Sequence, residues 1–330
     1  MECTSLVTGA TGFVGSAVVR ALLAAGHSVR VLARPGSDRR NLAGLPISLA
    51  EGSLEDNDSL RAAVGGCQFL FHAAADYRLW VRDPAAMLRT NVDGTQNLMR
   101  AAMAAGVSRV VYTSSVATLG HRLDGPADET TPSSLSDMTG PYKRSKFLAE
   151  EAVQRMIREE GLPAVIVSPS TPIGPGDIKP TPTGRLIVEA ALGKVPAYVD
   201  TGLNVVHVDD VASGHLLALE KGKIGERYVL GGDNLALAEI LTTIAKTVGR
   251  RPPVVKLPRL PLYPLALVAE AWGRLSGHEP LLTLDGLKMA KWRMWFDSTK
   301  AEQALGYTHR PAEQAIHDAI GWFRDNGYCR

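Results

Sequence analysis

Two side chains that can exchange a proton stand four residues apart near the middle of the 330-residue chain. Tyr142 and Lys146 fall on a predicted helix, where this spacing places both on one face. A tyrosine with its ordinary pKa of about 10 is a poor base at neutral pH, and a nearby ammonium lowers that pKa. Ser115, which ends an upstream apolar run, can hold a substrate oxygen. Because a Tyr and a Lys at this spacing occur on many helices, the pair predicts proton transfer only together with Ser115 and the glycine loop described next.

A glycine motif lies close to the first residue. Gly9, Gly12 and Gly15 follow a predicted strand at 5–7 and open a predicted helix at 13–25. A helix N-terminus offers free N–H groups and the positive end of its dipole, and glycines let the backbone approach a pyrophosphate. We therefore expect dinucleotide contacts from Gly9, Thr11, Gly12, Phe13, Val14 and Gly15. The alternative is a glycine turn that serves packing alone.

Short apolar runs alternate with longer helical patterns through the first half of the chain. Strands are expected at 29–32, 68–72, 110–113 and 164–168, and helices at 87–105 and 142–160. This alternation predicts βαβ units and hence an α/β fold, a Rossmann-type doubly wound parallel sheet. The second half is less regular, with strands expected at 205–211 and 228–230, and it predicts a smaller C-terminal substrate lobe. We expect a dinucleotide-binding domain of 1–168 with the returning segment 203–232, and a substrate-binding lobe of 169–202 and 233–330.

The composition is ordinary for a globular enzyme, with 45% apolar residues, 21% charged residues and a net charge of +2. This balance argues against a nucleic acid partner. The start of the chain lacks the basic leader of a signal peptide, and no run of about 18 apolar residues is present, so we expect a cytoplasmic location. Cys3, Cys67 and Cys329 match no metal motif, and we expect free thiols and no metal.

Taken together, the motifs resemble the extended branch of the short-chain dehydrogenase/reductase superfamily over nearly the whole chain. The glycine spacing, Asn91–Thr95, the Tyr-x-x-x-Lys at 142–146 and His207–Ala212 match it in order. Within the branch, the sequence is most similar to bacterial hopanoid-associated sugar epimerases and to dihydroflavonol 4-reductases. The resemblance implies an NAD(P)-dependent oxidoreductase that transfers hydride at a secondary alcohol or carbonyl of a hopanoid-associated substrate, a triterpenoid or lipid-linked polyol. The alternatives are a sugar epimerase with tightly bound NAD(P) and a non-catalytic NADP-sensing protein.

The resemblance also implies roles for further residues. Lys146 would hold the nicotinamide ribose. Beyond the glycine loop, cofactor contacts are expected from Arg34, Ser53, Leu54, Ala73, Ala74, Ala75, Asn91, Thr113, Ser114, Tyr142, Lys146, Pro169 and Thr171. Substrate contacts are expected from Asp76, Tyr77, Ser115, Val116, Ala117 and Thr171. His121 is interpreted as an ordinary loop residue, with a role in the pocket as the alternative. Thr171 replaces an asparagine that touches the substrate in nucleotide-sugar epimerases, which argues against a nucleotide sugar.

The end of the second predicted strand bears on the choice of cofactor. NAD-binding folds carry an acidic residue there for the ribose 2′-OH, whereas this chain has Ala33 and Arg34 and no carboxylate to repel a 2′-phosphate. Arg34, with Arg39 or Arg40, can pair with such a phosphate through a bidentate contact. We therefore predict NADP. NAD is the alternative, with Arg34 stacked on adenine or facing water.

Residues 257–272 are rich in leucine, proline and aromatic side chains. The interpretation we favour is a core helix with a proline-stiffened connection. The alternative is an apolar lip for a small, lipid-like substrate, resting on a membrane surface. A second aromatic group, Trp292, Trp295 and Phe296, is expected to pack. The family resemblance further implies a homodimer through the helices at 87–105 and 142–160.

Overall fold

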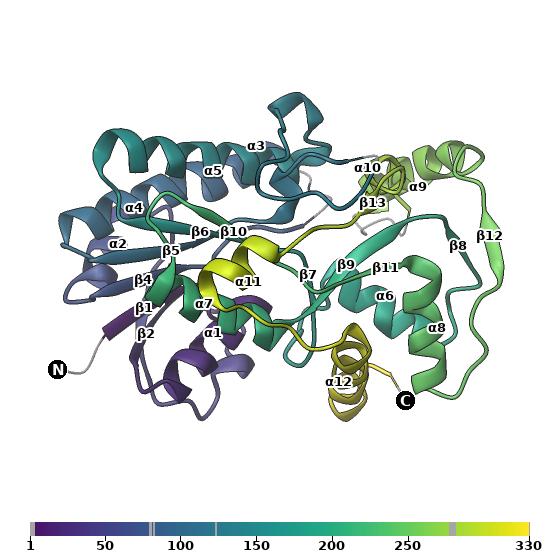
Figure 1. Ribbon diagram of the computed structural model, residues 1–330, viewed down its shortest axis with the longest axis horizontal. Coiled ribbons are helices and arrows are strands. Elements are labelled where there is room, and N and C mark those ends of the chain that lie inside the picture. The colour runs from purple at the N-terminus through teal and green to yellow at the C-terminus, as the bar shows by residue number, and fades with distance from the viewer. Residues whose placement is uncertain (1–3, 79–80, 82, 123, 277–281, 330) are drawn as a thin grey trace.

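A computed structural model describes residues 4–78, 81, 83–122, 124–276 and 282–329 of the chain. Figure 1 shows a large sheet with helices on both faces, followed by a smaller part built mainly from the C-terminal third. Cys3 lies outside the described residues, while Cys67 and Cys329 are buried free thiols. No helix in the described ranges is both long and apolar enough to span a membrane.

The large sheet has seven strands, all parallel, in the order β10-β6-β5-β4-β1-β2-β3. They are β1 (Thr4–Thr8), β2 (Ser28–Ala33), β3 (Ile47–Glu51), β4 (Phe69–His72), β5 (Arg109–Thr113), β6 (Ala164–Pro169) and β10 (Arg227–Leu230). The order reverses between β1 and β4, which is where open α/β sheets bind their ligands. The predicted Rossmann-type fold is confirmed.

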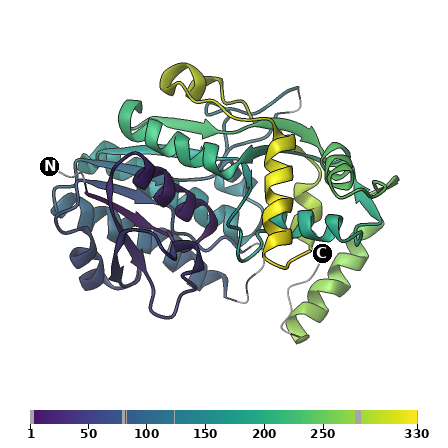
Figure 2. The same ribbon diagram turned by 90° about the horizontal axis from the view of Figure 1, so that it is seen from below.

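Each face of this sheet has its own apolar core, because neighbouring residues of a strand point to opposite sides. Leu6 belongs to one core and Val7 to the other, and both are fully buried. The Val7 side is covered by α1 (Phe13–Ala24) and α7 (Val208–Lys221), with α11 (Thr299–Leu305) against α7. The Leu6 side is covered by α2 (Asn57–Val64), α4 (Gly94–Ala104) and α5 (Gly140–Glu160). Figure 2, seen from below, shows α1 in front of the sheet.

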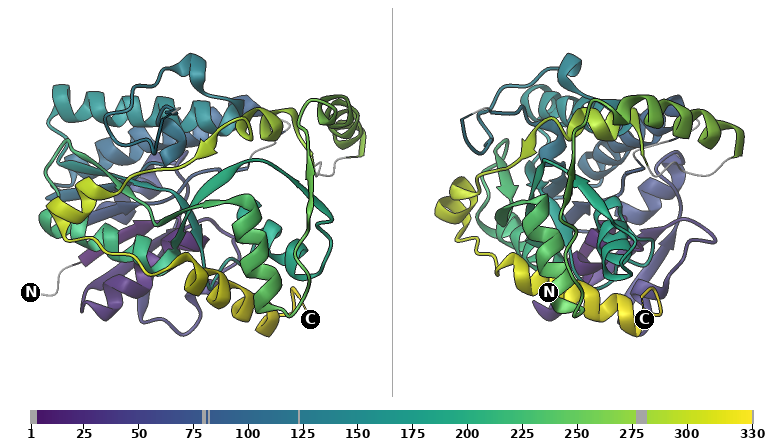
Figure 3. Two further views of the ribbon diagram at one scale, coloured as in Figure 1. Left: turned by 45° about the vertical axis from the view of Figure 1, so that its right-hand side comes forward. Right: turned by 90° about the vertical axis from the view of Figure 1, so that its right-hand side faces the viewer.

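The smaller part contains two further sheets. One joins β7 (Thr171–Ile173), β9 (Gly202–His207), β11 (Asp233–Ala236) and β13 (Arg293–Met294), and the other pairs β8 (Ala197–Val199) with β12 (Val255–Leu257). A third core lies among α6 (Pro182–Ala191), α8 (Leu237–Thr247) and α12 (Ala312–Asp325), and Figure 3 shows α12 running beside α8. α9 (Leu262–Ser276) packs against α10 (Leu284–Met289). Short 3₁₀ turns occur at Arg40–Leu42, Val116–Thr118 and Leu135–Asp137.

Four expectations about elements differ from the structure. The strand expected at 205–211 ends at His207, because that side chain accepts a hydrogen bond from the Asp209 amide (3.0 Å) and caps α7. Of the predicted returning segment 203–232, α7 and β10 join the large sheet, whereas β9 belongs to the second sheet. The helix expected at 87–105 is three pieces: α3 (Pro84–Leu88), a π-helical turn (Arg89–Asp93) and α4. The favoured core-helix interpretation of 257–272 is wrong, since most apolar side chains of this stretch are exposed.

Candidate active site

The glycine loop lies at the carboxyl end of β1, at the point where the strand order reverses. Gly9 has φ +73°, and a Cβ there would stand 2.6 Å from the Ala74 backbone nitrogen. A Cβ at Gly15 would stand 2.2 Å from the Gly9 carbonyl oxygen. The loop is therefore closed tightly on itself and on the turn after β4, so no side chain larger than hydrogen fits at Gly9 or Gly15.

The N-terminus of α1 suits a dinucleotide pyrophosphate. Gly12 is its N-cap residue, no side chain caps the helix, and its first turn has no acidic residue. The first amides are therefore left for an anion, at the positive end of the dipole. Within this predicted set, the Phe13 side chain packs into the core, so only its backbone can serve a ligand.

The predicted residues after β4 are held by their backbone. The Ala73 amide donates to the Thr8 carbonyl (3.2 Å), and the Ala74 amide to Thr8 Oγ1 (3.4 Å). Asn91, on the π-helical turn, accepts from the Asp76 amide (2.7 Å) and donates to the Asp76 carbonyl and to Ser145 Oγ (both 2.9 Å). Asn91 thus ties this turn to α5 and shapes the site from behind, while its own contact with a cofactor stays a prediction.

Ser115, Tyr142 and Lys146 come together at the carboxyl end of β5. The Ser115 side chain lies near the Tyr142 hydroxyl and, against the rise that burial causes, lowers the Tyr142 pKa. Ser115 Oγ also accepts from the Ala117 amide (3.1 Å), which fixes the start of the short turn holding Val116. Lys146 Nζ donates to the Thr113 carbonyl (2.7 Å) and to the Tyr112 hydroxyl (3.4 Å). The three side chains predicted for proton transfer are adjacent on α5 and β5.

The electrostatics of this group differ from the sequence expectation. Burial raises the pKa of Tyr142, and the Ser115 side chain opposes the rise. Burial lowers the pKa of Lys146 to about 8, with the charge of Glu150 acting in the opposite direction. The expected lowering of the Tyr142 pKa by Lys146 is therefore absent, because that ammonium is turned to Thr113 and Tyr112. Tyr142 is a neutral hydroxyl at pH 7 here, hence a proton donor.

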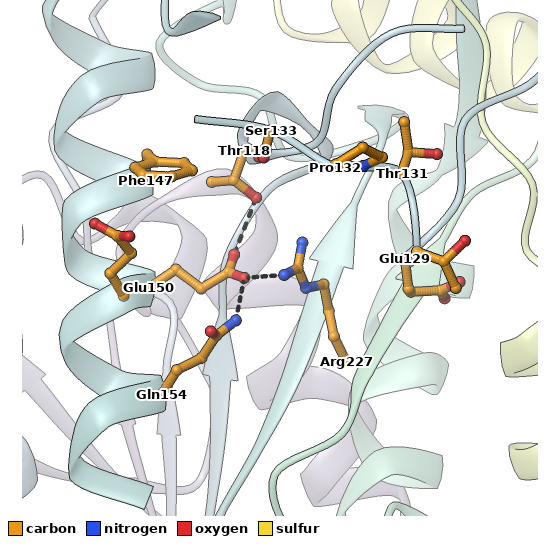
Figure 4. A pocket seen from close by; sticks show the side chains of 11 residues that line it. Thr118, Glu129, Thr131, Pro132, Ser133, Phe147, Glu150, Gln154 and Arg227 are labelled. Carbon is orange, nitrogen blue, oxygen red and sulfur yellow. Dashed lines mark hydrogen bonds and ion pairs between the residues drawn. The ribbon is translucent and has the colours of Figure 1, made fainter. Parts of the chain in front are cut away.

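Glu150, one turn beyond Lys146, organises the neighbouring side chains and was not anticipated. Its buried carboxylate accepts from Ser114 Oγ and from Thr118 Oγ1 (2.9 Å), on either side of Ser115. It also pairs with Arg227 (2.9 Å) on β10. Figure 4 shows Glu150 with Thr118, Gln154 and Arg227 beside a cavity of about 240 Å³. Glu150 positions Ser115 through Ser114, which precedes it, and through Thr118, whose hydroxyl also donates to the Ser115 carbonyl (2.8 Å). Its signal in the sequence, a glutamate four residues after Lys146, is too common to identify it.

The loop after β6 closes the site from the other side. Pro169 is the last residue of β6, and Thr171, partly buried, opens β7. The Ser170 hydroxyl between them is buried with no hydrogen-bond partner among the described residues. Asn41 Nδ2 joins this loop to the glycine loop through the carbonyls of Gly176 (2.9 Å) and Thr11 (3.4 Å). The predicted loop residues thus lie beside the dinucleotide site, and Asn41 is a further residue that sequence reasoning missed.

The arginines after β2 have different partners. Arg39 pairs with Glu51 (2.5 Å) and Arg40 with Asp38 (2.7 Å). Arg34 is exposed, and its guanidinium has no hydrogen-bond or ion-pair partner in the described part of the chain. The expectation of no carboxylate here is wrong, because Glu51 is the register neighbour of Ala33. Ser53 and Leu54 follow Glu51 directly, with Leu54 buried against Gly94.

The predicted substrate residues lie at the edge of this group. Asp76 forms an ion pair with Arg78 (2.5 Å), and Tyr77 is 41% exposed. Burial raises the pKa of Tyr77, helped by the charges of Asp177 and Asp76, which places Tyr77 opposite the loop that carries Asp177.

A buried lysine beside Tyr142 was also missed. Lys143 is 5% exposed, and its ammonium has no hydrogen-bond or ion-pair partner among the described residues. Burial lowers its pKa. Burial, aided by the charge of Lys143, also lowers the pKa of His121 to about 4, and His121 stacks on Trp292 at 5.5 Å between ring centroids. Lys143 and His121 therefore lie near Tyr142 on the side of the C-terminal lobe, and the role of His121, as a loop residue or in the pocket, stays a prediction.

Comparison with known proteins agrees with this geometry. Residues 5–231 match the model of the NAD dependent epimerase/dehydratase family. A Synechocystis sp. protein provisionally named dihydroflavonol 4-reductase is 46% identical over 98% of this chain and 95% of its own length. Sterol demethylase protein B of Methylococcus capsulatus is 34% identical over 98% of this chain and 99% of that protein. The crystal structure of gox2253 is 56% identical, with a TM-score of 0.90 and full coverage of both chains. The chain is an enzyme of the short-chain dehydrogenase/reductase type and belongs to the NAD dependent epimerase/dehydratase family.

Proposed function

We propose that this enzyme is an NADPH-dependent reductase that converts a carbonyl of an apolar, polycyclic lipid of the hopanoid type to a secondary alcohol. The observation that carries the proposal is that the Ser115 and Tyr142 hydroxyls face each other, with Lys146 one turn further along α5 and the glycine loop at the same edge of the sheet. This arrangement places a group that can orient a substrate oxygen beside a group that can donate a proton. A sugar epimerase, which would oxidise and re-reduce its substrate without net use of the cofactor, is the second candidate.

The chain's own residues support the direction of reduction. A carbonyl that accepts a hydride develops negative charge on its oxygen, and that oxygen must gain a proton. Burial keeps Tyr142 neutral, so it can supply the proton, while Ser115 donates a hydrogen bond to the same oxygen. Lys146 lies one helical turn away and can restore the proton of Tyr142. When bound, the nicotinamide supplies the hydride.

The choice of NADPH rests on Arg34. A 2′-phosphate prefers a guanidinium that is not already paired, because a paired one must first release its carboxylate. Arg39 and Arg40 are paired with Glu51 and Asp38, whereas Arg34 is free of such contacts among the described residues. The carboxylate of Glu51 is neutralised by Arg39 and does not stand alone against a phosphate.

Two features support an apolar substrate. Thr171 stands where nucleotide-sugar epimerases carry an asparagine. The relative from Methylococcus capsulatus is named for a sterol, a polycyclic lipid, and it matches this chain from end to end.

The decisive experiment measures the stoichiometry of NADPH oxidation against product for polycyclic ketones and for nucleotide sugars. We expect one NADPH consumed for each ketone reduced. Tyr142→Phe should lower kcat/KM by roughly 10²- to 10⁴-fold with NADPH binding retained. Tyr198→Phe, which removes a hydroxyl from the remote strand β8, is the matched control and should leave turnover unchanged. Turnover of a nucleotide sugar at constant NADPH would establish the epimerase instead.

The cofactor is tested separately by fluorescence titration. Arg34→Ala should weaken NADPH binding by about tenfold or more and leave NADH binding unchanged. The control is Arg40→Ala, which removes a neighbouring arginine already paired with Asp38. Equal affinity of the wild type for the two cofactors would contradict the assignment of NADPH.

A further inference from the structure

The exposed apolar side chains of the molecule are concentrated in one short stretch. Of the eleven large apolar side chains that are exposed in the described chain, eight lie between Val254 and Trp272. Their exposed fractions run from 37% at Leu257 to 83% at Val254. Scattered exposed apolar side chains are normal on proteins, whereas a contiguous group marks a surface that binds something.

The helix α9 within this stretch is amphipathic, but its apolar side chains face solvent and not the protein core. Leu265, Val268 and Trp272 follow one another at helical spacing and are 59%, 69% and 68% exposed. The opposite side carries Ala266, which is fully buried, and Glu270, whose carboxylate accepts the Leu284 amide (2.8 Å) and so holds the start of α10. The apolar side chains therefore point to solvent, whereas Glu270 points to the protein. The outward face of α9 is not the face that packs against the protein core.

The shape of the molecule leaves this face open. Figure 2 shows α9 projecting from the body of the C-terminal lobe, with α10 as its neighbour on the inner side. A helix that projects, with one face against the protein and an apolar face outward, can lie flat on a bilayer with that face in the acyl boundary. The tryptophan at its end suits the interface between headgroups and chains.

Charge around the helix selects an anionic bilayer over a second protein surface of ordinary charge. Residues 250–293 contain eight Lys or Arg and three Asp or Glu, so this segment carries +5 while the remaining residues together carry −3. Arg250, Arg251 and Lys291 are exposed and have no ion-pair partner among the described residues. Lys256 and Lys288 are paired with Asp200 (2.6 Å) and Asp285 (3.6 Å). Basic residues beside an apolar helix attract anionic headgroups.

The position of α9 relative to the active site gives the surface a use. Asp285 of α10 lies against Gly140, where a Cβ would stand 2.9 Å from its Oδ2. Gly140 opens α5 two residues before Tyr142. Trp292, just after α10, stacks on His121. The α9–α10 pair is therefore linked to the substrate side of Tyr142 through direct contacts.

We propose that the outward face of α9, with Leu260 and the strand residues Val254 and Val255, docks this enzyme on the surface of an anionic lipid bilayer. Docking there brings the substrate side of the active site next to the membrane, from which an apolar substrate can enter. The membrane contact rests on the exposed face and its charge, and its test does not depend on the proposed reaction.

The test is flotation of the full-length chain with vesicles of phosphatidylcholine and phosphatidylglycerol in equal parts, and with vesicles of phosphatidylcholine alone. We expect the wild type to float with the mixed vesicles and more weakly with the neutral ones. Leu265→Ser, Val268→Ser and Trp272→Ser together should weaken binding by roughly a hundredfold or more. The matched control combines Leu49→Ser and Ile224→Ser, which remove exposed apolar side chains elsewhere and should leave vesicle binding unchanged.

A second measurement locates the helix directly. Lipids brominated near the headgroup should quench the fluorescence of Trp272 on binding, and Trp272→Phe should remove that part of the quenching while the protein still floats. The proposal is overturned if the wild type fails to bind mixed vesicles, or if the triple variant binds as the wild type does. It is also overturned if sedimentation shows a dimer without vesicle affinity that the triple variant dissociates, because a second copy then covers the face.

Discussion

The two parts of the molecule use their apolar residues in opposite ways. In the large sheet, Leu6, Val7 and Leu70 are fully buried between helices that the same chain supplies. In α9, Leu265 and Val268 keep more than half of their surface exposed. In the first part, the apolar runs of the sequence and the buried residues of the structure coincide. In the second part, the pattern points to a partner that the chain does not contain.

The largest effect on the well-packed large-sheet part is expected from a substitution in the glycine loop. Gly15→Ala should destabilise the fold by roughly 3 kcal/mol or more and abolish NADPH binding, because its Cβ would lie 2.2 Å from the Gly9 carbonyl oxygen. Urea unfolding and fluorescence titration measure the two effects. Gly36→Ala is the control, since Gly36 has open space around it, and its positive φ (+70°), which Gly15 does not share, is its only source of strain. It should cost only about 1 kcal/mol. Equal effects of the two variants would contradict the tight closure of the loop.

This contrast also shows what the sequence can predict. The glycine loop and strands β1, β2, β4, β5 and β6 follow from local rules, namely steric limits at glycine and continuous apolar runs. β3 lies at the edge of the sheet and its residues are partly exposed, so it lacks the continuous apolar run of a buried strand. Neither β3 nor the helix α2 that follows it was predicted. The π-helical turn at Asn91 breaks a helix without a proline or glycine at its start, so no local signal announced it.

The parts of the site that sequence reasoning missed depend on contacts between distant segments. Glu150 acquires its role from Arg227 and Thr118, and Asn41 acquires its role from Gly176. The orientation of α9 is a similar case. Its helical periodicity shows that one face is apolar, yet only the fold shows that this face is left uncovered. Local patterns identify chemistry and elements, whereas partners between segments need the three-dimensional arrangement.

Asp177, on the loop between β7 and α6, should make stability fall as pH rises. Burial raises its pKa from 3.8 to about 6, against the opposing hydrogen bonds from Thr181. A raised pKa means that the folded chain binds the proton more tightly, so this contribution is present below about pH 4 and is lost as pH rises through about 6. Asp177→Asn cannot ionise. Its stability relative to the wild type should therefore grow by about 2 to 3 kcal/mol between about pH 4 and pH 8.

Urea unfolding across that pH range measures the Asp177 effect. Asp38→Asn is a control of opposite sign, because the hydrogen bonds from Arg40 lower the pKa of Asp38 to about 2. The wild type should lose its advantage over that variant as pH falls. A stability difference between Asp177→Asn and the wild type that does not change with pH would contradict the raised pKa of the buried Asp177 carboxyl group.

Replacing Lys143, beside Tyr142, should raise the stability of the fold and weaken substrate binding. Its side chain is buried and its ammonium has no hydrogen-bond or ion-pair partner among the described residues, so Lys143→Met should stabilise the fold by about 1 kcal/mol. If this lysine serves the substrate, KM rises by roughly tenfold with kcat little changed. Arg144→Met, the exposed neighbour on α5, is the control and should change neither quantity. A stabilised Lys143→Met enzyme with unchanged KM would assign Lys143 no part in substrate binding.

The smallest effect is expected where the comparison began, on the outward face of α9. Replacing Leu265 and Val268 with serine should change the free energy of unfolding by less than about 0.5 kcal/mol, because both side chains already face water in the free protein. Leu287→Ala, on α10 beneath it, should cost about 2 to 5 kcal/mol, since Leu287 is buried. Thermal and urea unfolding of both variants measure this contrast. A large loss from the serine variant would mean that the α9 face is covered in solution by the chain itself or by a second copy, and the difference between the two parts of the molecule would then disappear.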